Sequence, residues 1–219
     1  MIGAAGAALA WGCAESPTAP VGSSTTTTTV PSTTPGACAV TPAETVGPYP
    51  SLVDLIRSDI REGKAGTELT LTISVVNTNA ACGAVTGALV EIWQCDAVGN
   101  YSAYGSQAGR TYLRGIQTTD AAGQVVFTTI YPGWYQGRAT HIHAEVTIGG
   151  VSRKVTQIAF PEATSNAVHA TAAYGSRGAN PTTNLRDGIF ADSLSDELVT
   201  PEGDPASGYR ASFRIGIAL

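Results

Sequence analysis

Charged side chains are scarce in this 219-residue sequence. They make up 13% of the residues, against about 25% in typical soluble domains. The 12 basic residues are outnumbered by 17 acidic ones, which gives a formal net charge of −5. Proteins that bind nucleic acids need basic charge to displace the counterions of the phosphates, so this balance argues against a nucleic-acid partner.

Long apolar runs are also missing. Although 43% of the residues are hydrophobic, no uninterrupted apolar stretch reaches 18 residues, and the sequence therefore predicts no transmembrane span. The 25 glycines and 12 prolines fall short of the share that marks low-complexity chains. They fit a β protein rich in turns.

The first 36 residues differ in composition from the rest. Small apolar residues run from Met1 to Cys13, and a stretch rich in Thr, Ser and Pro follows. The first part is typical of a secretory signal, and the second of a solvated spacer that cannot bury a core. We therefore divide the chain into a signal-like leader with its spacer, residues 1–36, and one domain, residues 37–219. We expect the protein to be exported.

Two details of the leader bear on how the protein is exported. Gly12-Cys13 after apolar residues resembles a bacterial lipoprotein cleavage site, which makes Cys13 a candidate lipid anchor at the cell surface. No Lys or Arg precedes Arg57, so the positive region that normally opens a secretory signal is missing. We take this to favour a true start upstream of Met1 over a chain that is not exported.

Four cysteines are present, Cys13, Cys38, Cys82 and Cys95. If Cys13 is lost or lipidated with the leader, the other three allow one disulfide, in any of three pairings, and leave one thiol free. Their spacing is not that of a zinc site. This usage of cysteine is compatible with export.

Beyond residue 37, apolar and polar residues alternate with the period of a β-strand. The clearest run covers residues 69–75, where every second residue is apolar. Similar runs cover residues 88–94, 112–118, 124–130, 141–148, 151–160 and 209–217. Short helices are expected at three places, near residues 51–57, 163–169 and 193–198. The pattern predicts an all-β fold, an antiparallel β-sandwich with short helical segments and long active-site loops.

Only three histidines occur, and two of them form the sequence His141-Ile142-His143 in a strand-like run. Residues i and i+2 of a strand lie on one face, so the two imidazoles can converge on one metal ion. The same spacing occurs in zinc, copper and iron sites and does not identify the metal. The alternative is a pair of polar residues on a solvated strand face.

One tyrosine and one arginine stand close to this pair in the sequence, and a second tyrosine follows an earlier strand-like run. Tyr135 and Arg138 lie in the glycine-rich segment 131–140, which leads directly into the histidines. Tyr101 follows the run at 88–94. The glycine-rich segment therefore places a phenol and a guanidinium beside the imidazoles, and the strand-like run upstream supplies a second phenol.

These segments resemble the intradiol ring-cleavage dioxygenases, the superfamily of catechol and protocatechuate dioxygenases. The matching segments are Thr41-Pro42 with Gly47-Pro48-Tyr49, VEIWQCDAVGNYS at 90–102, LRGIQTTDAAG at 113–123 and YPGWYQGRATHIH at 131–143. The chain is most similar to small exported members with one domain, and it lacks the N-terminal helical dimerisation region of catechol 1,2-dioxygenases. The resemblance implies an oxidoreductase that uses O2 to cleave a small aromatic diol between its hydroxyls, giving a cis,cis-muconate-type product.

The resemblance also implies the ligands of a non-haem Fe(III), namely Tyr101, Tyr135, His141 and His143. Two phenolates would offset the charge of the ferric ion, and anionic oxygen ligands favour ferric over ferrous iron. No Asp or Glu stands in the segment 131–143, which supplies three of these ligands, and this argues against a two-histidine, one-carboxylate Fe(II) site. Tyr104 is the rival for the first position, but the sequence around Tyr101 matches the family better.

Further site residues follow from the same resemblance. Tyr135 is expected to accept a substrate proton, and the fixed charge of Arg138 to stabilise carbanionic character on the ring. Gln157 is expected to line the site. A simple two-residue turn at Gly149-Gly150 would pair Gln157 with Ile142, on the face away from the histidines. We therefore predict a longer turn or a β-bulge.

The substrate pocket is less well defined by the sequence. Tyr49 is a candidate pocket wall, or else a core or rim residue. Trp134 is a candidate for stacking on an aromatic substrate, although a place at the edge of the sandwich is more usual for such a residue. Trp93 is expected in the core, and His169 outside the catalytic site. The motifs fit plain, carboxylated or hydroxylated catechols and lignin-derived phenolics, and they assign no oligomeric state.

Two other functions are compatible with parts of the pattern. One is a β-sandwich module that binds a carbohydrate or a partner and has lost the metal, but the presence of all four ligand types argues against it. The other is a copper or zinc protein built on the histidine pair. Such a protein would hold metal without the phenolate-to-iron absorption band that an Fe(III) dioxygenase would show.

Overall fold

The structure, a computed structural model, describes Gly3 and residues 38–219. The predicted leader and spacer, with the candidate lipid anchor Cys13, lie outside these residues except for Gly3. Among the described residues, no helix combines the length and apolar character needed to cross a membrane.

Strands dominate the described part of the chain, and helices are short. The strands are β1 (Glu68–Asn77), β2 (Gly83–Ala84), β3 (Leu89–Trp93), β4 (Arg114–Thr118), β5 (Gln124–Ile130), β6 (His141–Ile148), β7 (Val151–Ala159), β8 (Glu202–Asp204) and β9 (Gly208–Ile217). The α-helices are α1 (Glu162–His169) and α2 (Leu194–Glu197), and the 3-10 helices are η1 (Thr78–Ala80), η2 (Gly105–Gln107) and η3 (Asn184–Arg186).

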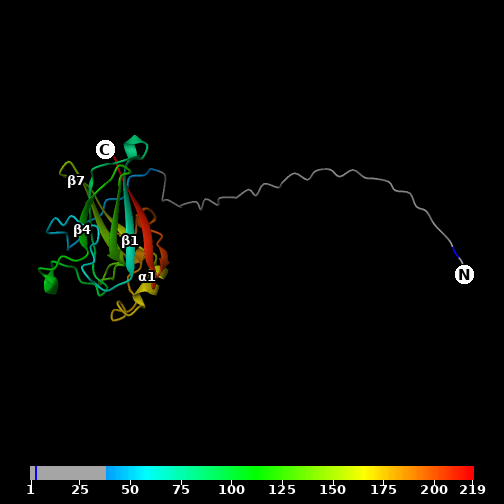
Figure 1. Ribbon diagram of the computed structural model, residues 1–219. Helices are drawn as coiled ribbons and strands as arrows, with labels where there is room; N and C mark the ends of the chain where they lie inside the picture. Colours follow the sequence, from blue (N-terminus) through cyan, green and yellow to red (C-terminus); the bar gives the residue numbers. More distant parts are fainter. Residues whose placement is uncertain (1–2, 4–37) are drawn as a thin grey trace. The chain divides into compact units, whose positions relative to one another are not determined.

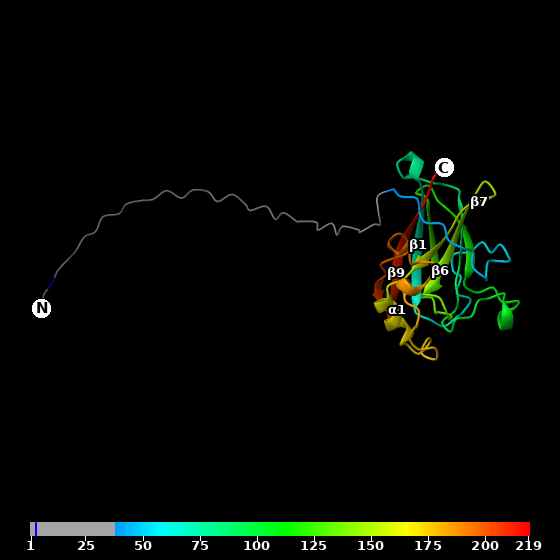
Figure 2. The same ribbon diagram turned by 180° about the vertical axis from the view of Figure 1, so that it is seen from behind.

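The strands form two sheets. The first has the order β2-β1-β9-β8, with β5 also paired to β1, and the second has the order β4-β3-β6-β7. Figures 1 and 2 show β1 beside the red strand β9. The predicted all-β sandwich is confirmed. One pairing departs from the antiparallel prediction, because β1 and β9 run parallel. The long connection through α1 and α2 returns the chain to the end of the sheet at which β1 begins.

The core lies between the two sheets and follows the predicted alternation. From the first sheet, β1 contributes Leu69, Leu71, Ile73 and Val75, and β9 contributes Tyr209, Ala211, Phe213 and Ile215. From the second sheet, β3 contributes Val90 and Ile92, and β6 contributes Ile142, Ala144 and Val146. Each strand of the second sheet therefore turns alternate residues away from the core, and this outer face carries the histidines.

The predicted helices are confirmed at two of three places. α1 and α2 occupy the segments expected near residues 163–169 and 193–198. The helix expected at 51–57 is wrong, because this segment is extended and pairs with β4. The backbone N–H of Ile116 donates to the carbonyl of Leu55 (2.7 Å), and that of Arg57 donates to the carbonyl of Ile116 (3.1 Å). These bonds to the edge of a sheet replace those of a helical turn.

Of the three possible cysteine pairings, the structure forms Cys38–Cys82. The bond ties the start of the described chain to the segment that follows β1. Cys95 is free and buried, and burial raises the pKa of its thiol to about 12. Because thiol reactivity depends on the thiolate, Cys95 is an unreactive buried residue.

A β-bulge follows the Gly149-Gly150 turn, as predicted. Val146 pairs with Lys154 but Thr147 pairs with Ser152, so Arg153 is the extra residue. Beyond the bulge, His143 stands opposite Gln157. The bulge therefore places Gln157 on the same face as the histidines.

The core assignment predicts the effect of one truncation. Ile73→Ala should lower the free energy of unfolding by about 2–5 kcal/mol, because Ile73 is fully buried between the sheets. Val126→Ala, on the solvent face of the adjacent strand β5, is the control and should cost about 0.5 kcal/mol or less. Urea denaturation measures both values, and equal losses would contradict the assignment of the two faces.

Candidate metal centre

His141 and His143 project from the outer face of β6, yet they are buried, with 2% and 1% of their surface exposed. Side chains on the outside of a sheet stay buried only where other segments cover them. The rings of Tyr135 and Phe190 lie 5.5 and 6.4 Å from that of His141. Gly47 packs directly on His143. Three separate loops therefore enclose the pair.

The geometry of the pair is that of two donors aimed at one point. The Nε2 atoms of the two imidazoles are 3.2 Å apart. His141 Nδ1 lies 2.6 Å from the carbonyl oxygen of Ala139, which can only accept, so the proton sits on Nδ1 and Nε2 carries the lone pair. Trp93 stacks on His143 with an interplanar angle of 3° and holds its plane.

Both imidazoles are neutral in this environment. Burial, and then the positive charge of Arg138, lower the pKa of His141 to about 3. Burial and the neighbouring His141 lower the pKa of His143 well below its ordinary value. The neutral imidazole is the form that binds metal ions.

Two phenols complete the cluster. Tyr101 Oη lies 3.4 Å from His141 Nε2, and the ring of Tyr135 stands edge-on to Tyr101, with ring centroids 5.6 Å apart. Tyr104 instead donates its hydroxyl hydrogen to the carbonyl of Pro50 (2.8 Å). The structure therefore brings Tyr101 to the histidines and turns Tyr104 away.

The donor set fits a hard, highly charged metal ion. The described residues contain no cluster of three or more His, Cys, Asp and Glu side chains, so the convergent donors are two imidazoles and two phenols. Burial raises the pKa of both phenols, that of Tyr101 well above its ordinary value. Phenolates form there only beside a strong positive charge. Ferric iron suits this set better than zinc, which takes mainly imidazole, thiolate and carboxylate ligands.

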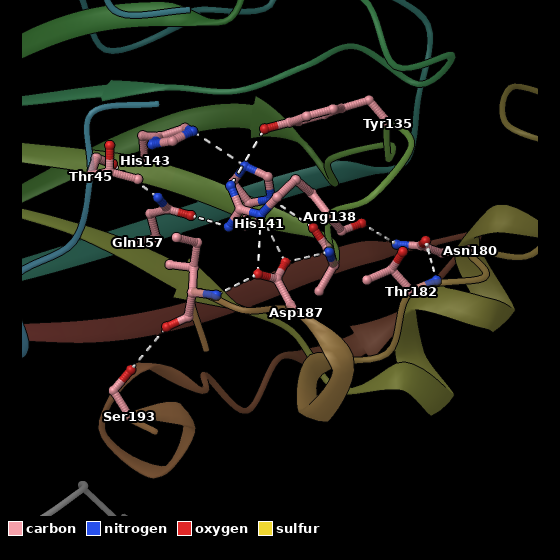
Figure 3. A network of polar contacts seen from close by, with 12 residues as sticks. Thr45, Tyr135, Arg138, His141, His143, Gln157, Asn180, Thr182, Asp187 and Ser193 are labelled. Carbon is pink, nitrogen blue, oxygen red and sulfur yellow. Dashed lines mark hydrogen bonds and ion pairs between the residues drawn. The ribbon is translucent and has the colours of Figure 1, made fainter. Parts of the chain in front are cut away.

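Arg138 links the tyrosine to the predicted glutamine. Its Nε donates to both oxygens of Asp187 (2.9 and 3.1 Å). One terminal nitrogen lies 3.4 Å from Tyr135 Oη, and the other donates to Gln157 Oε1. Gln157 Nε2 in turn donates to the carbonyl of Thr45 (2.9 Å). Figure 3 shows these side chains meeting beside His141.

The two candidate substrate residues have different surroundings. Tyr49 stacks on Tyr101, with ring centroids 4.6 Å apart, and its edge meets Tyr104 and Tyr135. The structure does not bring Trp134 to this aromatic cluster. Its indole N–H donates to Gly178 (3.0 Å) and its ring lies 4.3 Å from the guanidinium of Arg177.

Two other predicted placements can be compared with the structure. Trp93 is buried as expected, but it packs with Tyr101 and Cys95 on the outer face, in a cluster separate from the main core. His169 is buried at the end of α1, where its Nε2 lies 3.2 Å from the carbonyl of Pro132. Its partners are core tyrosines, not the histidine pair.

Sequence reasoning missed Arg114 and Asp187. Arg114 is fully buried and donates to the hydroxyl and carbonyl oxygens of Ser102 (2.9 and 2.8 Å) and to the carbonyl of Tyr49 (3.0 Å). It therefore ties the segments of Tyr101 and Tyr49 together. A charged residue between apolar neighbours in a strand-like run was an available signal for Arg114. Asp187 stands in no recognisable motif, and only its distant partner Arg138 reveals it.

Close backbone packing sets the spacing of the site. A Cβ atom on Gly133 would lie 2.3 Å from the carbonyl oxygen of Asp96, so only glycine lets the loops of Tyr101 and Tyr135 meet. Gly47 has a φ of +71°, and a Cβ there would lie 2.9 Å from His143 Cε1. Thus Gly47 serves both the turn and the close approach to the imidazole.

Because Gly47 packs so close to His143, an alanine at this position should lower the free energy of unfolding by more than its backbone conformation alone would. Gly63, with a φ of +73° and open space around it, is the matched control. Gly63→Ala should cost about 1–2 kcal/mol of unfolding free energy for its backbone conformation, and Gly47→Ala about 1 kcal/mol more for the clash. Urea denaturation measures the difference. If the two variants lose the same unfolding free energy, the segment around Gly47 shifts to accommodate the methyl group and no clash with His143 occurs.

The chain is similar to one protein family and to several solved structures. The profile of the family described as Dioxygenase matches residues 50–173. No curated protein matches the chain. An intradiol ring-cleavage dioxygenase from Tetranychus urticae is 30% identical with a TM-score of 0.77, over 83% of this chain and 95% of that one.

Two further solved structures are similar. The dioxygenase domain of a dioxygenase and carbohydrate-binding fusion from Streptomyces sp. SirexAA-E is 27% identical with a TM-score of 0.63, over 83% of this chain and 99% of that one. The 3-chlorocatechol 1,2-dioxygenase from Rhodococcus opacus 1CP is 18% identical with a TM-score of 0.58, over 81% of this chain and 72% of that one. It shares the fold. By profile, identity and coverage, the chain belongs to the family of intradiol ring-cleavage dioxygenases.

Proposed function

We propose that this protein is an Fe(III)-dependent intradiol dioxygenase in the breakdown of aromatic compounds. Its substrates would be O2 and a catechol-type 1,2-dihydroxybenzene, and its product a cis,cis-muconate-type dicarboxylic acid. The observation that carries the proposal is the convergence of the His141 and His143 Nε2 atoms with Tyr101 Oη, beside Tyr135.

Tyr101, Tyr135, His141 and His143 would hold the iron. When bound, ferric iron supplies a Lewis acid that favours phenolate and catecholate forms and draws electron density from the substrate ring. Because the imidazoles are neutral and buried, they balance none of the metal's charge. The phenolic oxygens of Tyr101 and Tyr135 would supply that balance.

Tyr135 is the residue we assign to proton transfer. Its Oη is the acceptor for a proton from a substrate hydroxyl, and Arg138 stabilises the anionic oxygen from 3.4 Å away. Tyr135 is half-buried and Tyr101 is fully buried, so Tyr135 is the phenol that an arriving diol can reach. Arg138 also places a fixed positive charge beside the ring on which negative charge develops.

Tyr49 and Gln157 would position the substrate. The ring of Tyr49 stacks on Tyr101 and meets Tyr135 edge-on, so it forms an aromatic wall beside the donors. Gln157 accepts a hydrogen bond from Arg138 and donates one to the carbonyl of Thr45. It therefore connects the segment that carries Thr45 and Tyr49 to the arginine. Trp134 has no part in this proposal, because it packs on Arg177.

We also propose that the protein is exported, as a secreted or lipid-anchored form with Cys13 as the anchor. The Cys38–Cys82 disulfide supports this proposal, because disulfides persist in oxidising compartments outside the cytosol.

The iron proposal predicts a coloured protein. The chain loaded with Fe(III) should be purple to burgundy from phenolate-to-iron charge transfer, at one iron per chain. Chelation should remove both colour and ring cleavage, and iron, but not zinc or copper, should restore them. A preparation that stays colourless after iron is added would refute the proposal, and bound copper or zinc without the band would favour the alternative metal protein.

Tyr135→Phe tests the proton acceptor. We expect the variant to retain iron through the other three ligands while kcat falls by about 10²-fold or more. Turnover is measured by mass detection of the ring-opened acid over a panel of plain, carboxylated and hydroxylated catechols. Tyr209→Phe, a core tyrosine of β9, is the control and should leave kcat unchanged. Unaltered kinetics in Tyr135→Phe would remove Tyr135 from the mechanism.

A further inference from the structure

Asp187 holds Arg138 from a segment far along the chain. The side chains of Arg138 and Asp187 are 14% and 0% exposed. Asp187 Oδ1 accepts from Arg138 Nε (3.1 Å) and the backbone N–H of Ile189 (2.9 Å). Oδ2 accepts from Arg138 Nε (2.9 Å) and the backbone N–H of Ala139 (2.6 Å). With three N–H donors making four contacts to its two oxygens, the carboxylate has one orientation.

This arrangement engages only one nitrogen of the guanidinium. Because Nε is held by Asp187, the terminal nitrogens are turned toward Tyr135 Oη and Gln157 Oε1. The group is planar, so fixing Nε fixes the direction of the other two nitrogens. Figure 3 shows the carboxylate on one side of Arg138 and the tyrosine and glutamine on the other.

The segment that carries Asp187, residues 180–189, also bonds the backbone of Arg138. Asn180 Nδ2 donates to the carbonyl of Arg138 (3.0 Å), and Asn180 Oδ1 accepts from the N–H of Thr182 (3.0 Å). Residues 180–189 therefore hold both the main chain and the side chain of Arg138. They lie beyond residues 50–173, which carry the family match.

We propose that Asp187 is a positioning residue for ring cleavage, acting through Arg138. It aims the guanidinium at the Tyr135 hydroxyl and the reacting ring, and it balances the arginine's charge on the side away from them. The proposal rests on the function assigned to Arg138 above. A purely structural role, in which Asp187 only fastens the 180–189 segment to the loop that precedes β6, is the competing account.

Asp187→Asn removes the charge and places an N–H group against a donor. We expect kcat to fall by about 10- to 100-fold, because a misdirected catalytic group costs rates of this order, with KM changed less than about threefold. Iron content and thermal stability under the same conditions show whether the variant is folded and loaded. Glu197→Gln is the matched control. Glu197 is another fully buried carboxylate of the C-terminal region, held by Thr156 and Ser193, and its replacement should leave kcat unchanged.

A double-mutant cycle separates the two accounts. If Asp187 acts through Arg138, Arg138→Gln and the double variant Arg138→Gln with Asp187→Asn should have the same kcat. Losses that multiply would overturn the proposal. If Asp187→Asn does not fold, Asp187→Glu keeps the charge and moves it by one methylene. The same cycle with Asp187→Glu then decides.

A readout that needs no iron keeps this proposal distinct from the proposed function. In the full chain without iron, the Nε–H of Arg138 should give a slowly exchanging 15N NMR signal, which Asp187→Asn removes and Glu197→Gln preserves. A protected signal in Asp187→Asn would refute the positioning role. A wild-type protein with the protected signal but no iron band would refute the proposed function alone.

Discussion

Desolvation of two neighbouring histidines is the constraint on which the site depends. Side chains on the outer face of β6 would ordinarily meet water, but His141 and His143 are almost wholly covered. Their burial keeps the imidazoles neutral, which is the form that binds a metal, and burial makes the phenols beside them hard to ionise without a metal. The rest of the site is the covering that keeps these donors from solvent.

The segments that cover the histidines also carry two buried arginines, and each guanidinium has polar partners. Arg138 meets Asp187, while Arg114 is surrounded by carbonyl oxygens and lies over the rings of Tyr101 and Tyr104. A buried guanidinium without such partners would be expensive to desolvate. The two arginines therefore act as cross-links, joining segments 49–50, 101–102 and 187–189 around the histidines.

Local patterns in the sequence predicted much of this structure. Period-two alternation located the main strands and their buried face, and the spacing of His141 and His143 indicated a shared face. The position of Gln157 required a bulge. What remained hidden was long-range. The extended path of 51–57 depends on hydrogen bonds to β4, Trp134 is drawn away by Arg177, and Asp187 has meaning only beside Arg138, 49 residues earlier. No periodicity or spacing encodes such partners.

The parallel pairing of β1 with β9 has a consequence for how the chain folds. β1 lies in the interior of its sheet, between β5 and β9. Until residues 208–217 have been synthesised, one edge of β1 lacks its partner and offers open backbone hydrogen-bonding groups. The first sheet can form completely only after residues 208–217 are available. Its assembly therefore depends on contacts between residues far apart in the sequence, which slow folding. Truncation from the C-terminal end therefore removes the partner of a central strand, not a dispensable edge.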